Sequence, residues 1–576
     1  MQKKRSLQST QRSSRTDKTS VSAGGPRLPA ALSHRRKLGT TISFRLSLLL
    51  LLCILIFSAC SFGASSPSDP GFVLVTLDPN STATATPFQP APAPDTLTPN
   101  ATDQPTLTDL PTSTDLPTDT PVPTETASSI PIPPTDITLP ATTLPPITPP
   151  PSNTRTSYTF YIALNYAGRA AAVNETIRYL NTSGQALSSV VMAVEPNLWT
   201  NCFSLNVLNQ DGNAVNNYTL NGQRLTIYPP QPIQPGSITT FTLGFSLSLP
   251  PRTSNNTFGY LSYQINLTDW YPFIVPYSGG WVLHDIWPFG ENLVYDAADY
   301  DVNVKVNDPN VMIAASAPAD SNGDSTHYRL EGARTFVLSA SDQFKVDESA
   351  VGPVKISSYY FAGDENASKA VVWMATQSLG LYQAKFAAYP HSSLSVVETD
   401  IPDGQEYDGL VFLANSFYSG YNGTAKSDLF TIGTHEIAHQ WWFGLVGNDQ
   451  ATEPWLDEAL AVYSERIFYE YNYPNFGDWW WNFRVNFFGP SGYVDSSIYS
   501  FGTFRGYVNA VYLNGANFID DLRTRIGDDA FFAFLRDYQS QFAYGRATSS
   551  DFFAVLRQHT NRDFSDIVRR YFQNGY

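Results

Sequence analysis

The 576-residue sequence predicts a multi-domain α+β protein, in which an antiparallel β-sandwich-like domain precedes a mixed sheet packed against helices. Three observations predict this class. Residues 155–352 contain short segments in which apolar and polar residues alternate, separated by Pro, Gly and Asn turns. Residues 353–576 contain longer segments with helical periodicity. The residues before 155 are first basic, then apolar, then rich in Pro and Thr, so we expect the folded domains to begin there.

Residues 1–45 form a basic N-terminal region with eleven Lys or Arg residues and a single acid. They precede the apolar run LSLLLLLCILIFSACSF at residues 46–62. A spanning helix needs about 20 apolar residues, so this shorter run is typical of a signal sequence. Its end, FSAC, resembles the bacterial lipobox, which implies lipidation of Cys60. An uncleaved membrane anchor is the alternative. In both cases the positive-inside rule places the later residues outside the cytoplasm, tethered to the cell membrane.

Residues 63–154 are dominated by Pro, Thr, Ser, Ala and Asp and contain no Lys or Arg. This composition cannot bury enough apolar surface to fold, so we expect a disordered, extended linker. The whole chain carries a net charge of −16, which excludes nucleic acid as an expected partner of its acidic body. With only three cysteines in the chain, no disulfide framework is expected either.

The β-rich domain, 155–352, is predicted from five alternating segments: YTFYIALNY, VNETIRYLN, RLTIYPPQPIQPGSITTFTLGFSLSLP, YDVNVKV and TFVLSAS. In the second domain, YDGLVFLANSFY is predicted to be a strand. Five segments there have helical periodicity: NASKAVVWMATQSLGLYQAKF, KSDLFTIGTHEIAHQWWFG, PWLDEALAVYSERIFYEY, ANFIDDLRTRI and DDAFFAFLRDYQSQF. A strand followed by this run of helices predicts a small sheet packed against a helical lobe.

The stretch THEIAHQWW places His435 and His439 four residues apart, with Glu436 directly after the first. Residues i and i+4 share one face of a helix, so the two imidazoles would lie side by side. Ser427 suits the start of this helix and Gly444 its end. A helix histidine beside tryptophans is often a packed core residue, and a third ligand would distinguish a metal site from that arrangement.

The segment EPWLDEALAVY supplies the candidate third ligand, Glu458, nineteen residues after His439. Pro454 suits the first turn of a second helix. A turn around GNDQATE and an antiparallel return would bring Glu458 opposite the histidine pair. The sequence therefore predicts one Zn²⁺ per chain, bound by His435, His439 and Glu458, with the fourth position left for water.

This arrangement predicts hydrolytic chemistry. Zinc lowers the pKa of a bound water to about 7, and Glu436, which is not a ligand here, would accept its proton as general base. The resulting hydroxide would attack a polarised carbonyl, and a peptide bond is the natural target.

The motifs HEIAHQWW and WLDEALA, with their nineteen-residue spacing, resemble those of the thermolysin-like aminopeptidases, the gluzincin group that includes aminopeptidase N and leukotriene hydrolase. The resemblance covers about residues 157–576. It implies a thermolysin-like catalytic domain over 353–576 and removal of N-terminal residues from peptides. We expect a short form that lacks the large C-terminal helical domain of most relatives and therefore has a more open cleft.

The same resemblance implies further site residues. VYLNGANFIDDLRTRIGDDAFF is similar to the family's tyrosine segment, so Tyr512 would stabilise the oxyanion, with Tyr507 as the alternative. DGQEYDGLVF takes the place of the amine-binding segment, although the usual Gly-Ala-Met-Glu-Asn is not kept. Glu406 would then bind the substrate's amino terminus; otherwise it is an exposed turn acid. YQINLTDWYP is similar to a segment that lines the active site, so Gln264 would assist at the amine.

Three functions stay open from the sequence. A tethered zinc aminopeptidase that trims peptides is favoured because ligands, base and tyrosine occur together. A zinc endopeptidase with an open cleft is favoured by the altered surroundings of Glu406. A surface-binding protein on a metallopeptidase scaffold would be favoured by loss of Glu436 or Glu458, and both are present. The aromatic clusters DWWWNF and HQWWF could form a carbohydrate platform, but we expect them to be core.

Overall fold

The computed structural model describes residue 144 and residues 147–253, 256–322 and 324–576. The predicted basic region, the apolar segment with Cys60 and most of the predicted linker lie outside these residues. Within the described ranges, no helix combines the length and the apolar character needed to cross a membrane. Cys202 lies in this part, where it is buried as a free thiol.

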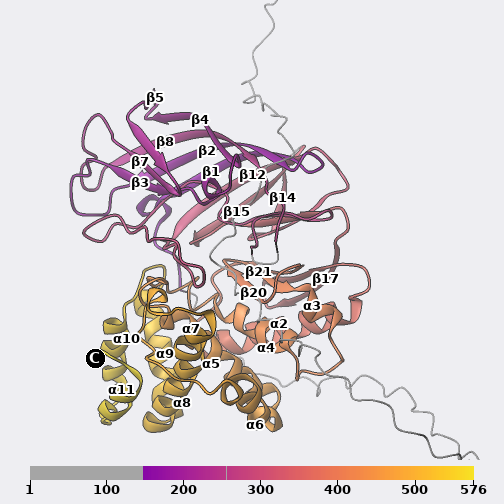
Figure 1. Ribbon diagram of the computed structural model, residues 1–576, viewed down its shortest axis with the longest axis vertical. Helices are drawn as coiled ribbons and strands as arrows, with labels where there is room; N and C mark the ends of the chain where they lie inside the picture. The colour runs from indigo at the N-terminus through magenta and orange to yellow at the C-terminus, as the bar shows by residue number, and fades with distance from the viewer. Residues whose placement is uncertain (1–143, 145–146, 254–255, 323) are drawn as a thin grey trace, which may run out of the picture. The chain divides into compact units, whose positions relative to one another are not determined.

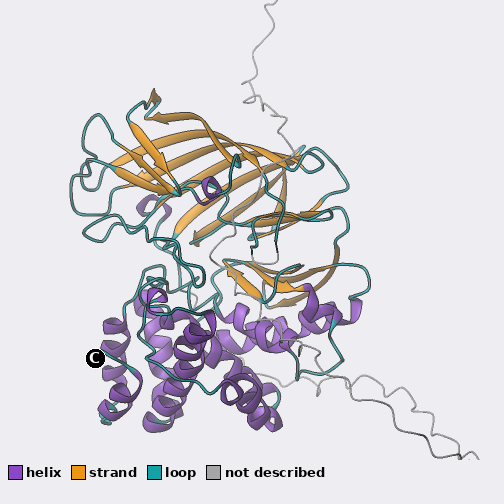
Figure 2. Cartoon of the chain, in the orientation of Figure 1, coloured by secondary structure: helices purple, strands orange, loops and turns teal. Residues whose placement is uncertain are grey.

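The first half of the described chain consists of three sheets, seen in Figures 1 and 2. The strands of the largest sheet are β1 (Ser157–Asn165), β2 (Ala170–Leu180), β4 (Phe203–Gln210), β5 (Asn213–Ala214), β8 (Ile238–Ser248), β12 (Ala298–Val306), β14 (Ala319–Asn322) and β15 (Ser325–Ala333). Their order is β14-β15-β12-β1-β2-β8-β4-β5. All these neighbours pair antiparallel except β1 and β12, which are parallel. The antiparallel domain predicted from the alternation thus contains one parallel pair.

Two four-stranded sheets complete this half. One contains β3 (Val190–Ala193), β6 (Tyr218–Asn221), β7 (Arg224–Ile227) and β11 (Phe273–Ile274), and the other contains β9 (Gly259–Tyr260), β10 (Ile265–Leu267), β13 (Met312–Ala315) and β16 (Leu338–Ser341). Of two short 3-10 turns, η1 (Ser152–Thr154) precedes β1 and η2 (Glu195–Leu198) lies between β3 and β4. Buried and partly buried residues alternate along β2, as its sequence predicts, and Phe160, Leu243 and Trp270 lie in a shared core.

The second half is built on a mixed five-stranded sheet, as predicted. Its strands are β17 (Lys345–Val351), β18 (Val354–Tyr360), β19 (Ser393–Thr399), β20 (Gly404–Tyr407) and β21 (Leu410–Ala414), in the order β17-β18-β19-β21-β20. The hairpin β17–β18 spans residue 352, where the sequence placed the domain boundary. The predicted strand over 407–418 is too long, because residues after Ala414 turn into helix α3 (Asn415–Ser419).

Helices cover this sheet and form the remaining part of the second half (Figure 2). They are α2 (Glu365–Lys385), α4 (Asp428–Ala438), α5 (Trp455–Asn472), α6 (Gly477–Trp480), α7 (Phe504–Tyr507), α8 (Asn514–Ile526), α9 (Asp528–Phe542), α10 (Ser549–His559) and α11 (Ser565–Tyr571). Shorter turns are η3 (Pro474–Phe476), η5 (Asn486–Phe488) and η6 (Ile498–Ser500), and two segments are π-helical, η4 (Trp481–Val485) and η7 (Val508–Leu513). Trp441 and Trp442 are buried in the core, as expected for HQWWF. In DWWWNF only Trp480 is buried, whereas Trp479 and Trp481 are partly buried and Phe483 is exposed, so the expectation is wrong for most of this cluster.

Helix α4 begins after Ser427, as predicted, but ends at Ala438 rather than near Gly444. Phe443 has a φ of 127°, which a helix cannot contain. The main-chain N–H groups of Gly444 and Leu445 instead donate to carbonyls five residues earlier. His439 therefore caps the helix, and the chain turns away directly after the second predicted ligand.

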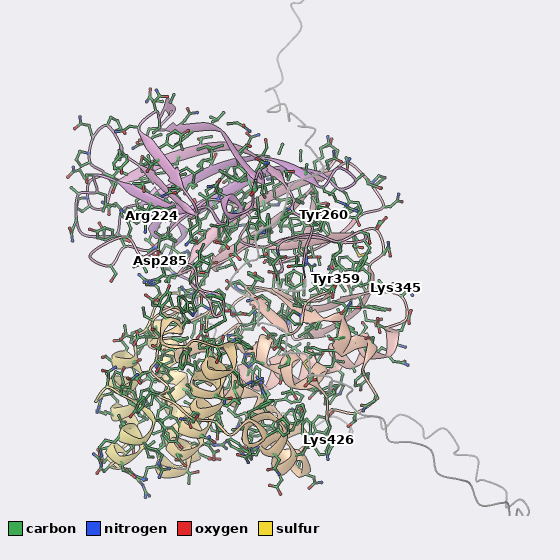
Figure 3. All side chains as sticks on the ribbon, in the orientation of Figure 1. Arg224, Tyr260, Asp285, Lys345, Tyr359 and Lys426 are labelled. Atoms are coloured by element: carbon green, nitrogen blue, oxygen red, sulfur yellow. The ribbon has the colours of Figure 1, made fainter. Side chains whose placement is uncertain are left out.

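Arg334 joins the two halves. Its buried guanidinium donates to the carbonyl of Tyr295 in the β half, at 3.0 Å. It also donates to main-chain carbonyls of the helical half, those of Phe443, Gly444, Leu445 and Gly545. Side chains fill the space between the halves (Figure 3). The loop after the histidine helix is therefore held in place by a residue of the β half.

Candidate active site

A cleft of about 460 Å³ is lined by residues of the edge strand β20, helices α4 and α5, and the chain between Phe483 and Tyr512. It is the place where the predicted metal ligands, the predicted base and the predicted oxyanion tyrosine come together. All three clusters of His and acidic residues that could hold a metal ion within the described ranges include residues of this cleft.

The three predicted ligands converge in the cleft. Nε2 of His435 and Nε2 of His439 lie 3.1 Å apart. Oε2 of Glu458 lies 3.3 Å from the first and 3.6 Å from the second. A tetrahedral zinc ion with bonds of about 2.0–2.1 Å would set its ligand atoms about 3.3 Å apart, so this triangle has the right size. Oε2 of Glu458 is buried and has no hydrogen-bond partner among the described residues apart from the two imidazoles, so it is available for a cation that takes the place of their protons.

The other ring nitrogen of each histidine has its own partner. Nδ1 of His435 lies 3.0 Å from Oε1 of Glu465, and Nδ1 of His439 lies 2.9 Å from the carbonyl of Trp442. Both partners accept hydrogen bonds, so each Nδ1 carries the proton when the imidazole is neutral. This leaves both Nε2 lone pairs directed to the shared position, the tautomer that metal binding requires.

The electrostatics of the ligand cluster favour positive charge. Burial lowers the pKa of His435, but hydrogen bonds to Glu458 and Glu465 outweigh it and raise the pKa to about 9. Burial likewise raises the pKa of Glu458, yet hydrogen bonds from both histidines bring it down to about 2. The cluster therefore stabilises positive charge at this point. A zinc ion would supply that charge in place of the protons.

Glu436 lies beside the ligands and lines the same cleft. Its side chain is buried, and Oε2 has no hydrogen-bond partner in the described structure. Burial raises its pKa well above the ordinary value, and Glu406 adds to this, whereas His435 and His439 act against it. The backbone of Gly404 passes so close that a Cβ at this position would collide with the Glu436 carboxylate. Strand β20 thus confines the predicted base.

The structure brings Tyr512, rather than Tyr507, to the cleft. Tyr512 lies in the π-helical η7, its ring stacks on His435 with 6.0 Å between centroids, and its hydroxyl donates to Oε1 of Glu458. π-Helical turns of this kind are frequent at functional sites. Tyr507 is fully buried behind it, stacked on Phe289, and is not part of the cleft lining. Burial, then the charge of Glu458, raises the pKa of Tyr512 well above its ordinary value, so its hydroxyl keeps its proton.

Glu406 lies in edge strand β20 and is buried in the cleft wall, so it is not an exposed turn acid. Glu291 lies beside it, a residue that sequence reasoning missed. Burial raises the pKa of both carboxyls; the charge of Glu406 also raises that of Glu291, and His439 counteracts the rise at Glu406. Oε2 of Glu291 is buried without a hydrogen-bond partner in the described structure. A bound cation such as an ammonium group would offset the repulsion between these two carboxylates and stabilise their ionised forms.

Gln264 does not reach the cleft. Its amide donates to Oγ of Ser339 at 3.0 Å and to the carbonyl of Glu398 at 3.1 Å, and accepts from Thr399 at 2.8 Å. These contacts engage both ends of the amide within the interface between the halves, and Gln264 is not among the residues of the cleft lining. The structure therefore gives no support to the predicted role of Gln264 at the amine.

One further residue that sequence reasoning missed, Glu465, supports a ligand. Glu465 accepts from Trp480 at 3.1 Å and binds Arg484 through both oxygens, in addition to His435. Glu465 lies seven residues after Glu458, two helical turns on, so the spacing itself could have indicated it. No sequence pattern points to Glu291, which enters the cleft from a loop of the β half.

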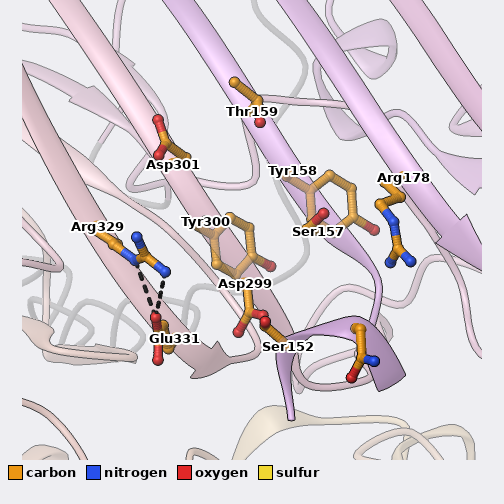
Figure 4. A pocket seen from close by; sticks show the side chains of 11 residues that line it. Ser152, Ser157, Tyr158, Thr159, Arg178, Asp299, Tyr300, Asp301, Arg329 and Glu331 are labelled. Carbon is orange, nitrogen blue, oxygen red and sulfur yellow. Dashed lines mark hydrogen bonds and ion pairs between the residues drawn. The ribbon is translucent and has the colours of Figure 1, made fainter.

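A second cavity of about 360 Å³ lies over β1 and β12 of the large sheet (Figure 4). Tyr158 and Tyr300 form part of its wall, and Arg329 pairs with Glu331 at 2.7 Å. Its lining contains no histidine or cysteine. The cleft at His435 is therefore the stronger candidate for chemistry.

Comparison with known sequences gives an independent result. Residues 388–571 match the Peptidase family M1 domain. Aminopeptidase M1-B from Oryza sativa subsp. japonica is 26% identical over 249 residues, which is 40% of this chain and 28% of that protein. Aminopeptidase O from Mus musculus is 32% identical over 105 residues, 18% of this chain and 12% of that protein. The chain thus spans well under half the length of these relatives.

Solved structures share the fold. An M1 zinc metallopeptidase from Deinococcus radiodurans matches with a TM-score of 0.52 and 16% identity, over 70% of this chain and 91% of its own. A mutant of an M1 zinc metallopeptidase from the same organism, bound to a Tyr-Ser-Ala substrate, matches with the same score and identity over 73% of this chain and 96% of its own. The predicted multi-domain α+β fold is confirmed by this likeness. Residues 388–571 are therefore similar to a peptidase family M1 domain, in agreement with the gluzincin aminopeptidase resemblance of the two helical motifs.

Proposed function

We propose that this protein is a zinc-dependent aminopeptidase that removes N-terminal residues from peptides outside the cytoplasm. The observation that carries the proposal is the convergence of His435, His439 and Glu458 on one point of a cleft that Glu436 and Tyr512 also line. The M1 family implies a zinc cofactor, and the three ligand atoms form a triangle of the size that zinc requires. Bound there, the metal would supply a Lewis acid that polarises a peptide carbonyl and acidifies water.

The chain's own groups would perform the remaining steps. Glu436, confined by β20, accepts the proton of the attacking water and passes it to the leaving amine. Tyr512 donates a hydrogen bond from its protonated hydroxyl to the oxygen that becomes negative as the carbonyl turns tetrahedral. Glu406 and Glu291 bind the free ammonium group of the first residue, which fixes the scissile bond one residue further on.

We also propose that the folded part is tethered to the outside of the cell membrane, through a lipid on Cys60 or an uncleaved anchor at residues 46–62. The basic region and apolar run support this. Incorporation of labelled palmitate by the chain, lost in Cys60→Ala, would identify lipidation. Membrane retention without label in both proteins would identify the anchor, and recovery in the soluble fraction would contradict both.

The test of the function uses the purified chain, with its zinc content quantified, and paired fluorogenic peptides that carry free or acetylated amino termini. We expect cleavage of the free form only. Glu436→Gln should keep the zinc and lose about 10²–10⁴-fold in rate, the range for loss of a general base. Exclusive cleavage of the free peptides would also support the ammonium site at Glu406 and Glu291.

The alternatives predict other results in the same assay. An endopeptidase with an open cleft would cleave both peptides at similar rates. A surface-binding protein on this scaffold would bind zinc and cleave neither. In either case the aminopeptidase proposal is wrong, and the metal content separates the scaffold from a chain that fails to bind zinc.

A further inference from the structure

Arg505 is a cation of the cleft wall without an acidic partner. It lines the cleft and is exposed to solvent. Its guanidinium lies 4.1 Å from the ring centroid of Phe488. No carboxylate among the described residues lies within salt-bridge distance of it, and no hydrogen bond of its side chain is found there. By contrast, Arg484, the other arginine of the cleft, is neutralised by Glu465.

The position of Arg505 relative to the reacting centre follows from the helix that carries it. Arg505 precedes Tyr512 by seven residues, and the chain between them passes from α7 into the π-helical η7, so the two residues lie fewer than two turns and at most about 10 Å apart along the axis. Val508, between them, lines the cleft as well, so the three side chains share one face. An extended peptide advances about 3.3–3.6 Å per residue, so the separation corresponds to about two or three residues.

The cleft is lined by both acidic and basic side chains. Besides burial, the groups that most affect the pKa of Arg505 are Arg484, which lowers it, and Asp403, which raises it. The buried acids Glu291 and Glu406 lie at the metal ligands instead. Asp403 and Asp428 also line the cleft, but neither forms an ion pair with Arg505, so its guanidinium can bind a carboxylate while the acids at the metal ligands bind an ammonium group.

We propose that Arg505 binds the C-terminal carboxylate of the substrate and so selects peptides of three or four residues. The inference rests on the proposed aminopeptidase function and adds the substrate class. The carboxylate forms a charge-assisted hydrogen bond with the guanidinium, which Phe488 supports from its opposite face. Phe483, Phe488 and Phe504 line the same region of chain, so the preferred peptides carry apolar side chains between their two charged ends.

The test compares tri- and tetrapeptides of apolar residues, with free amino termini, as carboxylates and as C-terminal amides. For the unmodified chain we expect kcat/KM to be about tenfold higher for the carboxylate, mainly through KM. In Arg505→Gln the two forms should be hydrolysed equally, and Arg505→Lys should keep part of the preference because the charge remains. The preference should also disappear for peptides of eight residues, whose carboxylate lies beyond Arg505.

Lys426→Gln is the matched control. Lys426, labelled in Figure 3, is also exposed and also lies over an aromatic ring, 4.5 Å from the centroid of Phe476. It is not among the residues that line the cleft. This variant should keep the full preference. Equal rates for carboxylate and amide in the unmodified chain, or a preference that survives in Arg505→Gln, would overturn the inference.

A binding measurement separates this inference from the proposed function. Zinc-loaded Glu436→Gln is titrated by calorimetry with the same carboxylate and amide peptides. Tighter binding of the carboxylate, lost when Arg505→Gln is added, supports the site at Arg505 even where no peptide is turned over. Equal binding of the carboxylate and amide peptides refutes the site at Arg505, even if the chain proves to be an active aminopeptidase.

Discussion

At the scale of single residues, the hydroxyl of Tyr512 is the group whose role can be isolated most cleanly. Removal of one oxyanion donor typically costs about 10²–10³ in kcat. We therefore expect Tyr512→Phe to lower kcat by about that factor while KM and zinc content stay close to those of the unmodified chain. Steady-state kinetics with metal analysis would check this.

Tyr493→Phe is the matched control for Tyr512→Phe. Tyr493 is 49% exposed and does not line the cleft. This variant should retain full activity. A Tyr512→Phe protein with unchanged kcat would shift the oxyanion role to another donor.

Glu195 predicts a pH dependence of stability that has nothing to do with catalysis. It is buried in the β half, and neither carboxylate oxygen has a hydrogen-bond partner in the described structure. Burial, then the charge of Asp269, raises its pKa to about 8. The pKa of Glu195 in the folded protein exceeds the unfolded value of about 4.5. Its contribution to the free energy of unfolding is therefore complete below pH 4.5 and is lost as the pH rises to about 8.

We accordingly expect the unmodified chain to lose up to about 1.4 kcal/mol of stability per pH unit in this window, relative to Glu195→Gln. Thermal unfolding of both proteins at pH 5 and pH 8 would measure it. Glu331→Gln, at an exposed site of β15, should show no such pH-dependent difference. A gap between Glu195→Gln and the unmodified chain that is equal at both pH values would show that Glu195 is ionised in the folded protein.

The sequence predicted some of the residues that line the cleft and missed others. His435, Glu436 and His439 stand out because helical spacing alone brings them together, and Glu458 follows from the antiparallel return of the next helix. Tyr512 and Glu406 became candidates only through the family resemblance, and Gln264 shows the limit of that approach, since its amide is engaged elsewhere. Glu291 could not be predicted, because a loop of the β half delivers it and no local pattern records such a contact.

At the scale of elements, helix α5 carries two acids with different tasks. Glu458 faces the metal position, and Glu465, two turns on, holds Nδ1 of His435. Partners of this kind fix the tautomer of a ligand, and their removal costs about 10–100-fold in metal affinity or activity. We expect Glu465→Gln to weaken zinc binding by that factor, as measured by competition with a chelator.

Glu470→Gln, five residues further along the same helix, is the control for Glu465→Gln. Glu470 pairs with Arg523 away from the cleft and is 30% exposed. Zinc affinity should not change in this variant. If both variants weakened zinc equally, the effect would reflect general destabilisation of α5 rather than the contact to His435.

The elements themselves were predictable where one pattern determined them. Alternation predicted β1, β2 and β12, and helical periodicity predicted α2, α4, α5, α8 and α9. The ends of the helices were less predictable than their existence. Helix α4 ends early because Phe443 adopts a positive φ, which only the contacts of the surrounding loop explain. The π-helical form of η7, which positions Tyr512, has no signature in the sequence either.

At the scale of the whole molecule, the sequence predicted an α+β chain with a β-rich half and a helical half, but not how the halves join. The join depends on polar contacts between distant residues, such as Arg252 with Thr399 at 2.7 Å and the N–H of Arg334 with Asp408 at 2.9 Å. Periodicity reports burial along one segment and carries no information about its partner.

Arg334→Met should destabilise the whole molecule. The substitution removes the donors of five main-chain carbonyls, those of Tyr295, Phe443, Gly444, Leu445 and Gly545. Loss of such a buried charged partner costs about 3–5 kcal/mol. Denaturant unfolding should show a lower midpoint and a separation of the two halves into distinct transitions.

Arg329→Met, at an exposed site in β15 of the same half, is the control and should unfold like the unmodified chain. An Arg334→Met protein that unfolds in a single transition at the original midpoint would show that the apolar contacts between the halves are sufficient.

The contacts of Arg334 also limit how the β half and the helical half can be exchanged between proteins. Four of the carbonyls that it serves belong to the helical half, whereas the arginine belongs to the β half. A chimaera that keeps the helical half but takes its β half from another protein would bury these carbonyls without a donor, unless the new partner supplies one at the same place. The two halves are therefore expected to be inherited and exchanged together, as one unit of selection.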